Sequence, residues 1–335
     1  MGILGAALRT GFTEITRRMA TLVSLRNGQK MPQLGLGTYL ALKGECEDAT
    51  KYAIDIGYRH LDTAFSYNNE NEVGKAINAK IAEGVVKRED IFLVTKLSAI
   101  HHDPEHVERA CRMSLRNLGL DYIDLYLMHT PFGMEFHGDE DTAPKNSAGE
   151  MLFSNTDYLD TWRAMEPLVE KGLVRSIGVS NFSSHQLTRL LANCSVKPVA
   201  NQVECNPGIN QAPLRTYCAK NDIALIAFSP LGRPHYAAKD PKFPKPALLD
   251  DRVIAMAKKY GKTPGQIVLR FLVQLGTTPV PKSSNKERMK DNLEIFDFEL
   301  SPEDLCVMQS FNTGERTCPF TAFTTHKYFP FHEEF

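Results

Sequence analysis

Short apolar runs alternate with amphipathic stretches along the chain from residue 34 onward. The apolar runs have hydrophobic residues at successive positions, as strands buried on both faces do, and they lie at residues 34–39, 59–62, 91–96, 122–129, 175–180, 199–204, 223–229 and 278–283. Stretches with the period of a helix follow at residues 45–56, 71–83, 104–118, 158–171, 183–193 and 211–220, and helical pattern also lies beside the last two strands. The pattern therefore predicts eight strand–helix units.

The order of these units indicates the fold. Apolar strands separated by helices are typical of a parallel sheet covered by helices, and eight such units close the sheet into a barrel. No linker or change of composition divides residues 21–335. We therefore expect an α/β protein with one domain over these residues, a (β/α)8 TIM barrel.

The N-terminal segment, residues 1–20, differs from the rest, and we expect an unstructured extension. It contains three arginines and Glu14 as its only acidic residue, a composition that would also suit a mitochondrial presequence. Met19 offers an alternative start of the chain.

Capping residues support two of the helices. Asp103 is expected at an N-cap with Pro104 at the first helical position. Thr263 and Pro264 repeat this arrangement later in the chain.

Two further segments lack the period of a helix or a strand. Residues 133–150 are too long for a plain connector, so we expect a functional loop over one end of the barrel. The tail from Phe311 onward carries more aromatic residues than a disordered tail should. Its rings must be buried, either against the outer helices or over the barrel mouth.

Composition and charge narrow the possible partners. The 335 residues include 39 basic and 40 acidic ones, a formal net charge of −1, which gives no sign of a nucleic-acid or anionic-membrane partner. No apolar run reaches the roughly 18 residues that a membrane-spanning helix needs. The seven cysteines are scattered singly, which suits reduced thiols in the cytoplasm.

Three local patterns have simpler interpretations than the chemistry they suggest. Tyr39 and Lys43 have the spacing of short-chain dehydrogenases, but the glycine-rich dinucleotide fingerprint that should accompany it is missing from the sequence. His102 and His106 have the spacing of a metal pair, yet no third ligand lies nearby, so we predict surface histidines and no metal. Trp162 lies in an amphipathic stretch and should pack in the core.

Polar residues recur where the predicted strands end. Since all strands of such a barrel point the same way, these residues should meet at one mouth. Packing alone does not explain why so many apolar strands end in a charged or hydrogen-bonding group. The residues are Asp62, Lys96, His129, Asn181, Gln202 and Lys282.

Tyr67, five residues after Asp62, is the candidate acid of this mouth. A free tyrosine titrates near ~10, too high for efficient proton donation at neutral pH. A neighbouring Lys96 ammonium would lower the pKa of Tyr67, and Asp62 would hold Lys96 charged. His129 could orient a substrate oxygen by a hydrogen bond. Together they suit the protonation of a carbonyl oxygen beside a hydride source.

From Thr21 to the C-terminus the sequence resembles the aldo-keto reductase family. Three stretches are similar to signatures of that family and occur in the same order, namely "GYRHLDTAFSYNNENEVG", "WRAMEPLVEKGLVRSIGVSNF" and "VPKSSNKERMKDN". The resemblance implies that Asp62, Tyr67, Lys96 and His129 are the catalytic residues of a carbonyl reductase, because their spacing is that of the family.

The resemblance also implies NADPH bound across the mouth without a Rossmann fold. Ser180, Asn181 and Gln202 would hold the nicotinamide amide. Phe228 would stack on the nicotinamide ring, and residues 282–292 would meet the adenosine and its 2′-phosphate. The full implied cofactor set is Thr38, Tyr39, Asp62, Ser180, Asn181, Gln202, Phe228, Ser229, Leu231, Gly232, Lys282, Ser283, Ser284, Asn285, Arg288, Asp291 and Asn292.

The substrate residues implied in the same way are Tyr39, Tyr67, Ser98, His129 and Thr130. Three of them, Tyr39, Ser98 and Thr130, stand where aldose reductases have tryptophan, so the pocket should be roomier and less aromatic. In this family the C-terminal loop covers the mouth, so the tail is expected there. We therefore expect a cytoplasmic, monomeric, NADPH-dependent reductase of lipophilic aldehydes and ketones. The alternatives are a dedicated ketosteroid reductase and a binding or structural protein on the same barrel.

Overall fold

A computed structural model describes residues 21–42 and 44–332 of the chain. The expectations about residues 1–20, an unstructured extension or a presequence with Met19 as an alternative start, lie outside the described residues. Lys43 of the short-chain dehydrogenase pattern lies outside them as well.

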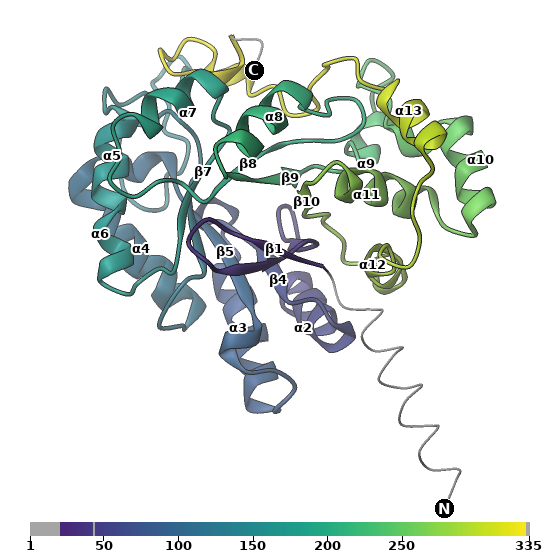
Figure 1. Cartoon of the computed structure of the whole chain (residues 1–335). Coiled ribbons are helices and arrows are strands. Elements are labelled where there is room, and N and C mark those ends of the chain that lie inside the picture. Colours follow the sequence, from purple (N-terminus) through teal and green to yellow (C-terminus); the bar gives the residue numbers. More distant parts are fainter. Residues whose placement is uncertain (1–20, 43, 333–335) are drawn as a thin grey trace, which may run out of the picture.

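Eight parallel strands form the centre of the molecule, each paired with its neighbour in sequence (Figure 1). The first strand and the segment just after the last strand meet at a parallel bridge between Gly37 and Lys282. The Gly35 N–H, just before the first strand, donates to the Pro279 carbonyl at 3.0 Å. These contacts close the sheet, so the predicted (β/α)8 fold is confirmed. The strands are β3 (Leu36–Gly37), β4 (His60–Asp62), β5 (Phe92–Leu97), β6 (Leu125–Met128), β7 (Ile177–Ser180), β8 (Ala200–Glu204), β9 (Ala224–Phe228) and β10 (Thr278–Pro279).

The seam between the first and last strands requires a glycine at position 37. A Cβ atom there would lie 2.7 Å from the Val280 carbonyl oxygen, closer than packed atoms approach. Because Gly37 allows this contact, Lys282 arrives beside the strand that leads to Tyr39.

Helices follow the strands and surround the barrel (Figure 1). The prediction of one helix over residues 158–171 is wrong, because Pro167 has no N–H to continue the hydrogen-bond pattern and begins a second helix. The helices are α2 (Glu45–Ile56), α3 (Glu70–Ala82), α4 (Pro104–Leu118), α5 (Tyr158–Met165), α6 (Pro167–Glu170), α7 (Ser184–Leu191), α8 (Ala212–Lys220), α9 (Pro234–Ala237), α10 (Asp251–Tyr260), α11 (Pro264–Gln274), α12 (Lys286–Leu293) and α13 (Pro302–Gln309).

One of the two predicted caps is formed. Thr263 accepts a hydrogen bond from the Gln266 N–H, and the Gln266 side chain accepts one from the Thr263 N–H, which is a capping box. Asp103 stands at the N-cap position of α4, but it caps no N–H of the helix. Its carboxylate instead accepts a hydrogen bond from the Thr156 hydroxyl, which ties α4 to the segment before α5.

An antiparallel hairpin precedes the barrel, and the hydrophobic pattern did not predict it. It consists of β1 (Leu22–Ser24) and β2 (Lys30–Pro32), joined by a turn in which Gly28 has a φ of 86°. The Asn-Gly pair in this turn is a strong hairpin signal that could have revealed it. Leu25 and Met31 belong to the same buried cluster as Val94 inside the barrel, so the hairpin packs against the barrel interior.

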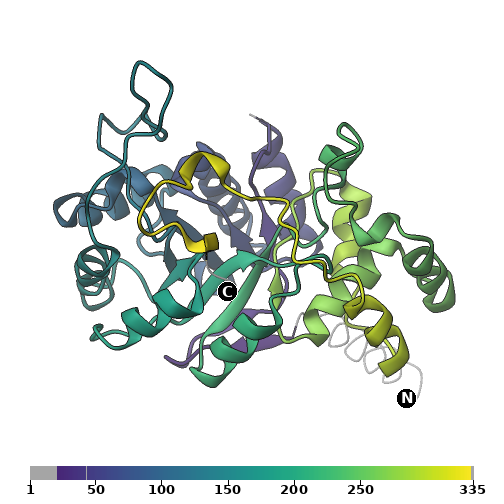
Figure 2. The same ribbon diagram turned by 90° about the horizontal axis from the view of Figure 1, so that it is seen from above.

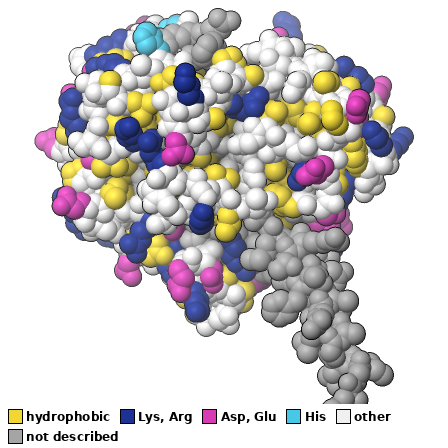
Figure 3. Space-filling view, in the orientation of Figure 1, with side chains coloured by type: hydrophobic (Ala, Val, Ile, Leu, Met, Phe, Trp, Pro, Cys, Tyr) yellow, Lys and Arg dark blue, Asp and Glu magenta, His cyan; other side chains and the backbone are white. Residues whose placement is uncertain are grey.

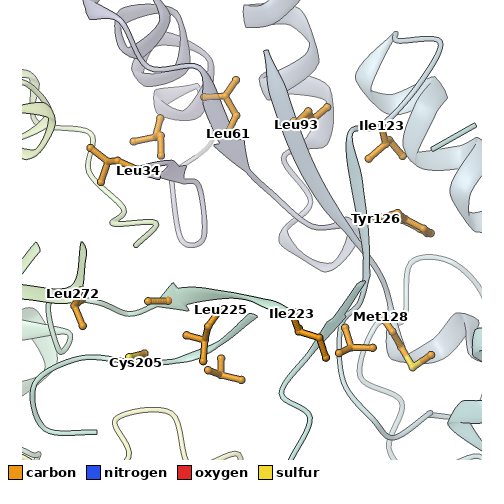
Figure 4. Close-up of a cluster of buried hydrophobic side chains, with 14 of the residues drawn as sticks. Leu34, Leu61, Leu93, Ile123, Tyr126, Met128, Cys205, Ile223, Leu225 and Leu272 are labelled. Atoms are coloured by element: carbon orange, nitrogen blue, oxygen red, sulfur yellow. The ribbon is translucent and has the colours of Figure 1, made fainter. Parts of the chain in front are cut away.

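The strands are buried on both faces, and successive side chains serve two different cores. Leu93 of β5 belongs to the larger cluster, between strands and helices, whereas Val94 belongs to the smaller cluster inside the barrel. Figure 4 shows part of the larger cluster, with Leu61 and Leu225 among the strand side chains in it. This alternation decides which strand residues can reach the mouth.

The tail lies on the rim of the barrel mouth, which is formed by segments that follow β6 and β7. Phe323 stacks on Phe132 with 5.0 Å between ring centroids, and the Tyr328 hydroxyl donates to Asp157 at 2.8 Å. None of the aromatic residues between 311 and 332 is fully exposed. Seen from above, the yellow tail crosses in front of the strands (Figure 2). Of the two placements left open, the structure has the one at the mouth.

The long segment 133–150 is joined to the start of α4. Arg109 donates two hydrogen bonds of 2.8 Å to Asp139, and the His101 ring lies 2.9 Å from the same carboxylate. The expected loop at this end of the barrel is therefore present.

On the face shown in Figure 3, basic and acidic side chains are interspersed, with scattered hydrophobic groups between them. Within the described residues, every helix is too short or too polar to span a membrane.

Candidate active site

The alternation of strand side chains directs the polar strand ends into the mouth. Val94 and Leu127 pack inside the barrel. Lys96 and His129 come two residues later, so they point to the same side and lie nearer the open end. Side chains two residues apart on a strand point to the same side, which explains why the residues at the ends of β4, β5 and β6 meet at the mouth as predicted.

Asp62 and Lys96 form a buried ion pair at the centre of this mouth. The Lys96 Nζ donates to Asp62 Oδ1 and to the Thr63 carbonyl, both at 2.8 Å, and Lys96 is 0% exposed. Asp62 Oδ2 accepts from Gln202 Nε2 at 2.7 Å. Burial lowers the pKa of Lys96, and the Asp62 carboxylate opposes this change by favouring the ammonium. The pair joins strands β4, β5 and β8.

Tyr67 lies over this pair, at the end of a 3-10 turn, Phe65–Tyr67, that follows β4. Its ring centroid is 5.0 Å from the Lys96 Nζ. Burial raises the pKa of Tyr67 well above 10, and the Asp62 carboxylate adds to this effect. The expectation of a lowered pKa for Tyr67 is therefore wrong for this structure, because burial, together with the Asp62 carboxylate, raises the pKa of Tyr67. At neutral pH Tyr67 is a phenol that still has its proton to give.

His129 faces Tyr67 across the mouth, with 5.7 Å between ring centroids and 73° between ring planes. Burial, helped by the Lys96 cation and by His102, lowers the pKa of His129 to about 3. The ring is therefore neutral at pH 7 and offers one N–H as a donor. The Asn181 side chain donates to the His129 carbonyl at 3.0 Å, which ties the end of β6 to the end of β7.

The implied nicotinamide residues lie together at the ends of β7 and β8. The Ser180 hydroxyl donates to the Gln202 carbonyl at 2.8 Å, and the Gln202 side-chain amide donates a hydrogen bond to Asp62. Asn181 Oδ1 is buried and has no hydrogen-bond partner in the described part of the chain. An unpaired buried acceptor fits a carboxamide N–H2, so this end of the site suits a nicotinamide. Phe228, half-buried at the end of β9, packs against the cluster inside the barrel.

The implied phosphate residues surround the N-terminus of α12. Asn285 caps this helix by accepting from the Arg288 N–H at 2.9 Å, and the Ser283 hydroxyl accepts from the Asn285 N–H at 3.2 Å. Lys282 and Arg288 are exposed there. Two exposed cations beside a helix N-terminus suit an anion such as a phosphate. Ser284 is exposed nearby, Asp291 is half-buried, and Asn292 is 6% exposed on the same helix.

Other implied cofactor residues line the path between these ends. Thr38 is buried, and its hydroxyl donates to the Asp62 carbonyl at 2.9 Å. Ser229 has a φ of 49° and Gly232 a φ of 70°, so the chain bends sharply after β9. Leu231 packs on the outer core.

The implied substrate residues differ in how far they are open to the mouth. The Tyr39 ring is 51% exposed and lies 4.9 Å from the Tyr67 ring. Ser98 is 1% exposed and accepts a hydrogen bond from Ser66 at 3.1 Å. The Thr130 hydroxyl donates to the Phe132 carbonyl at 2.7 Å.

Two polar residues of this end of the barrel did not emerge from the sequence. Glu204 ends β8 and is fully buried, and its position two residues after Gln202 was an available signal. Arg233 follows β9 and contacts the tail, a contact that no sequence pattern indicates.

The structure also shows where the histidines and the tryptophan that the sequence singled out lie. No group of histidine, cysteine, aspartate or glutamate among the described residues could hold a metal ion. The prediction that His102 is a surface residue is wrong, because it is 0% exposed beneath the mouth. Trp162 is fully buried as predicted, and its indole N–H donates to the Val196 carbonyl at 2.9 Å.

Comparison with known proteins assigns the family. Residues 33–313 match the sequence model of the Aldo/keto reductase family, and the chain belongs to that family. Members of this family are oxidoreductases that use NADP, so the predicted family, class of enzyme and cofactor are confirmed.

The chain is similar to named relatives over nearly its whole length. It is 43% identical to prostaglandin F synthase 1 of Bos taurus and 43% identical to estradiol 17 beta-dehydrogenase 5 of Mus musculus, each over 319 residues that cover 93% of this chain and 98% of the relative. An aldo-keto reductase of Bombyx mori, solved in complex with NADP, superposes with a TM-score of 0.85 at 38% identity, covering 93% of this chain and 99% of that one.

His102 should make the protein sensitive to acid. Its two ring nitrogens have no partner in the described part of the chain, and burial lowers the pKa of His102 to about 3. An unfolded histidine titrates near ~6.5, so only the unfolded state gains a proton as the pH falls below that value. The unfolding free energy should therefore fall as the pH falls from about 6.5 toward 3, by about 1.4 kcal/mol per pH unit for this residue.

Urea unfolding at several pH values between 6.5 and 4 measures this slope. His102→Gln should have a shallower slope than the unsubstituted chain, and His137→Gln, in the exposed long loop, should not. An unchanged slope in His102→Gln would refute the assignment.

Proposed function

We propose that this chain reduces aldehydes and ketones to alcohols with NADPH, that its substrates are lipophilic, and that Tyr67 is the proton donor. The observation that carries the proposal is the meeting, at one mouth, of a protonated Tyr67 phenol, a neutral His129 imidazole and the buried Asp62–Lys96 pair. A carbonyl needs a hydride at its carbon and a proton at its oxygen to become an alcohol. NADPH, when bound, would supply the hydride.

Tyr67 would supply the proton. Its raised pKa keeps the hydroxyl protonated until a stronger base, such as the developing alkoxide, approaches it. The neutral His129 ring would donate a hydrogen bond to the same oxygen and fix its angle toward Tyr67.

The Asp62–Lys96 pair would act after the proton leaves. Loss of the proton turns Tyr67 into a phenolate, and the Lys96 ammonium 5.0 Å from the ring would stabilise that anion. Asp62 would keep Lys96 protonated in a site whose burial lowers the pKa of Lys96. In this account Lys96 stabilises the ionised product of the transfer and does not ionise Tyr67 beforehand.

The residues present fit NADPH at both ends of the mouth. The unpaired Asn181 Oδ1 would accept from the nicotinamide amide, with Ser180 and Gln202 beside it. The exposed Lys282 and Arg288 would offer charge-assisted hydrogen bonds to the 2′-phosphate.

An apolar rim supports lipophilic substrates. Tyr39, Leu40 and Leu42 follow β3, and they are 51%, 50% and 67% exposed. Since the Tyr39 ring lies against Tyr67, a carbonyl compound at Tyr67 would extend over this rim and bury apolar surface. Two relatives carry the names of enzymes of prostaglandins and of estradiol, which agrees with this class. A dedicated ketosteroid reductase is the narrower candidate within it.

A binding or structural role without catalysis is the less favoured alternative. A buried ion pair contributes little net stability, and a structural protein could replace it with apolar residues. The intact Asp62–Lys96 pair therefore favours an enzyme.

We further propose that the enzyme acts as a monomer in the cytoplasm. All seven cysteines are free, in keeping with a reducing compartment.

Tyr67→Phe should abolish carbonyl reduction, because the variant keeps the ring and loses the proton. General-acid loss lowers kcat by about 10²–10⁴-fold. NADPH affinity, measured by fluorescence titration, should stay nearly unchanged. Tyr122→Phe, just before β6 at the opposite end of the barrel, is the control and should keep its activity. If Tyr67→Phe retained most of its kcat, Tyr67 would not be the donor.

NADPH should bind much more tightly than NADH, because only NADPH carries the 2′-phosphate that Lys282 and Arg288 can bind. Lys282→Met combined with Arg288→Met should narrow the difference in Kd between the two cofactors. Lys290→Met, exposed on the same helix, serves as the control. Unchanged selectivity in the double variant would rule out this phosphate site.

Lipophilic carbonyls should be the better substrates. The kcat/KM values of a medium-chain enal and a 3-ketosteroid should exceed that of a polar aldose. In a chain truncated at Gly314 the ranking should change, because the tail no longer covers the rim. Equal preference for the aldose, or an unchanged ranking after truncation, would defeat the substrate assignment.

A further inference from the structure

A second buried carboxylate lies at the mouth, and the proposed proton transfer does not use it. Glu204 is 0% exposed at the end of β8. It comes two residues after Gln202, so the two side chains point to the same side of the strand. Burying a carboxylate is costly unless strong hydrogen bonds compensate for the lost water, so its partners indicate why it is there.

Those partners belong to the tail segment Arg316, Thr317 and Cys318, here called the strap. Glu204 Oε1 accepts from the Thr317 N–H at 2.7 Å and from the Thr317 hydroxyl at 2.5 Å. Oε2 accepts from the Cys318 N–H at 3.1 Å. The Asn206 amide is a distant fourth donor, at 3.5 Å. One carboxylate thus binds two successive backbone N–H groups of the tail.

Arg233 holds the other side of the strap. Its Nη1 donates to the Thr317 carbonyl at 2.9 Å and to Cys318 Sγ at 3.3 Å. Arg233 belongs to the segment after β9 that also contains Ser229 and Gly232 of the implied cofactor path. The strap is therefore bound between the end of β8 and this segment.

The strap borders the reacting part of the mouth. Burial is the main cause that raises the pKa values of Tyr39 and Tyr67, and the nearness of Cys318 adds to both. Arg316 lines a small hollow together with Asn181. The Cys318 Sγ also lies 3.6 Å from the Ser229 hydroxyl oxygen, so the strap contacts the implied cofactor path at the mouth.

We infer that Glu204 is a positioning residue that anchors the strap over the mouth and so sets the space available to bulky substrates. The inference rests on the proposed reductase function for its effect on substrates, but the anchoring itself does not. Glu204 contacts neither Tyr67 nor His129 by any hydrogen bond of the described residues, so its loss should alter substrate fit more than proton transfer.

Amide hydrogen exchange of the full-length chain, without substrate, tests the anchor. In Glu204→Gln one carboxylate oxygen becomes an N–H2 group, which cannot accept a hydrogen bond. The amides of Thr317 and Cys318 should exchange faster by about tenfold or more, since hydrogen bonds to charged groups are among the stronger ones. Thr317→Val removes one of the three bonds and should accelerate the same amides less. Glu315→Gln, an exposed tail carboxylate two residues away, is the control and should change neither.

Kinetics test the consequence. With a bulky lipophilic ketone the KM of Glu204→Gln should change by about threefold or more, while kcat for a small aldehyde stays within about twofold. Exchange rates unchanged at Thr317 and Cys318, or raised equally throughout β8 and β9, would overturn the inference. If Glu204→Gln does not fold, Thr317→Val decides by the same readout. If the unsubstituted chain reduces no carbonyl but Glu204→Gln still shows the faster exchange, the proposed function is wrong and the anchoring role of Glu204 holds.

Discussion

The buried ion pair between Asp62 and Lys96 is the interaction on which the rest of the mouth depends. Neither charge is stable in the barrel interior without the other. Together they join β4 to β5, and through Gln202 to β8. Tyr67 lies over the pair, and its proton is kept by burial and by Asp62. The pair therefore has two effects. Asp62 helps to keep the Tyr67 phenol protonated, and the Lys96 ammonium would stabilise the phenolate that forms when Tyr67 gives up its proton.

The backbone around the mouth has strained conformations at several residues. Leu40, Asn181, Ser229, Arg233 and Phe320 all have positive φ values between 49° and 64°. Such values are unfavourable for residues other than glycine and concentrate at functional sites. They occur where the chain leaves a strand or crosses the rim, so the backbone strain is concentrated around the mouth. The closed seam at Gly37 and the hairpin beneath the barrel supply the rigid frame.

Much of the fold and of the site can be predicted from the sequence, because the hydrophobic periods of strands and helices are visible within short stretches of the chain. In β5, Leu93 packs in the outer core and Val94 packs inside the barrel. Lys96 comes two residues after Val94, so it points to the same side and reaches the mouth. The pKa of Tyr67 could not be predicted, because it depends on burial and on a carboxylate that also neutralises Lys96. The burial of His102 and the partners of Glu204 depend on contacts with segments distant in sequence, including the tail. The hairpin was predictable from Asn27 and Gly28 but lay outside the pattern of strand–helix units.

The dependence of the mouth on this pair can be measured by the free energy of urea unfolding of Lys96→Met, of Asp62→Asn and of the double variant that carries both substitutions. If Asp62 and Lys96 stabilise each other in the barrel interior, Lys96→Met alone leaves an uncompensated buried carboxylate and loses about 3–5 kcal/mol. The double variant, without that charge, should be more stable than Lys96→Met alone. A double variant whose loss of stability equals the sum of the losses of the two single variants, or a Lys96→Met chain as stable as the unsubstituted protein, would show that the two charges do not depend on each other.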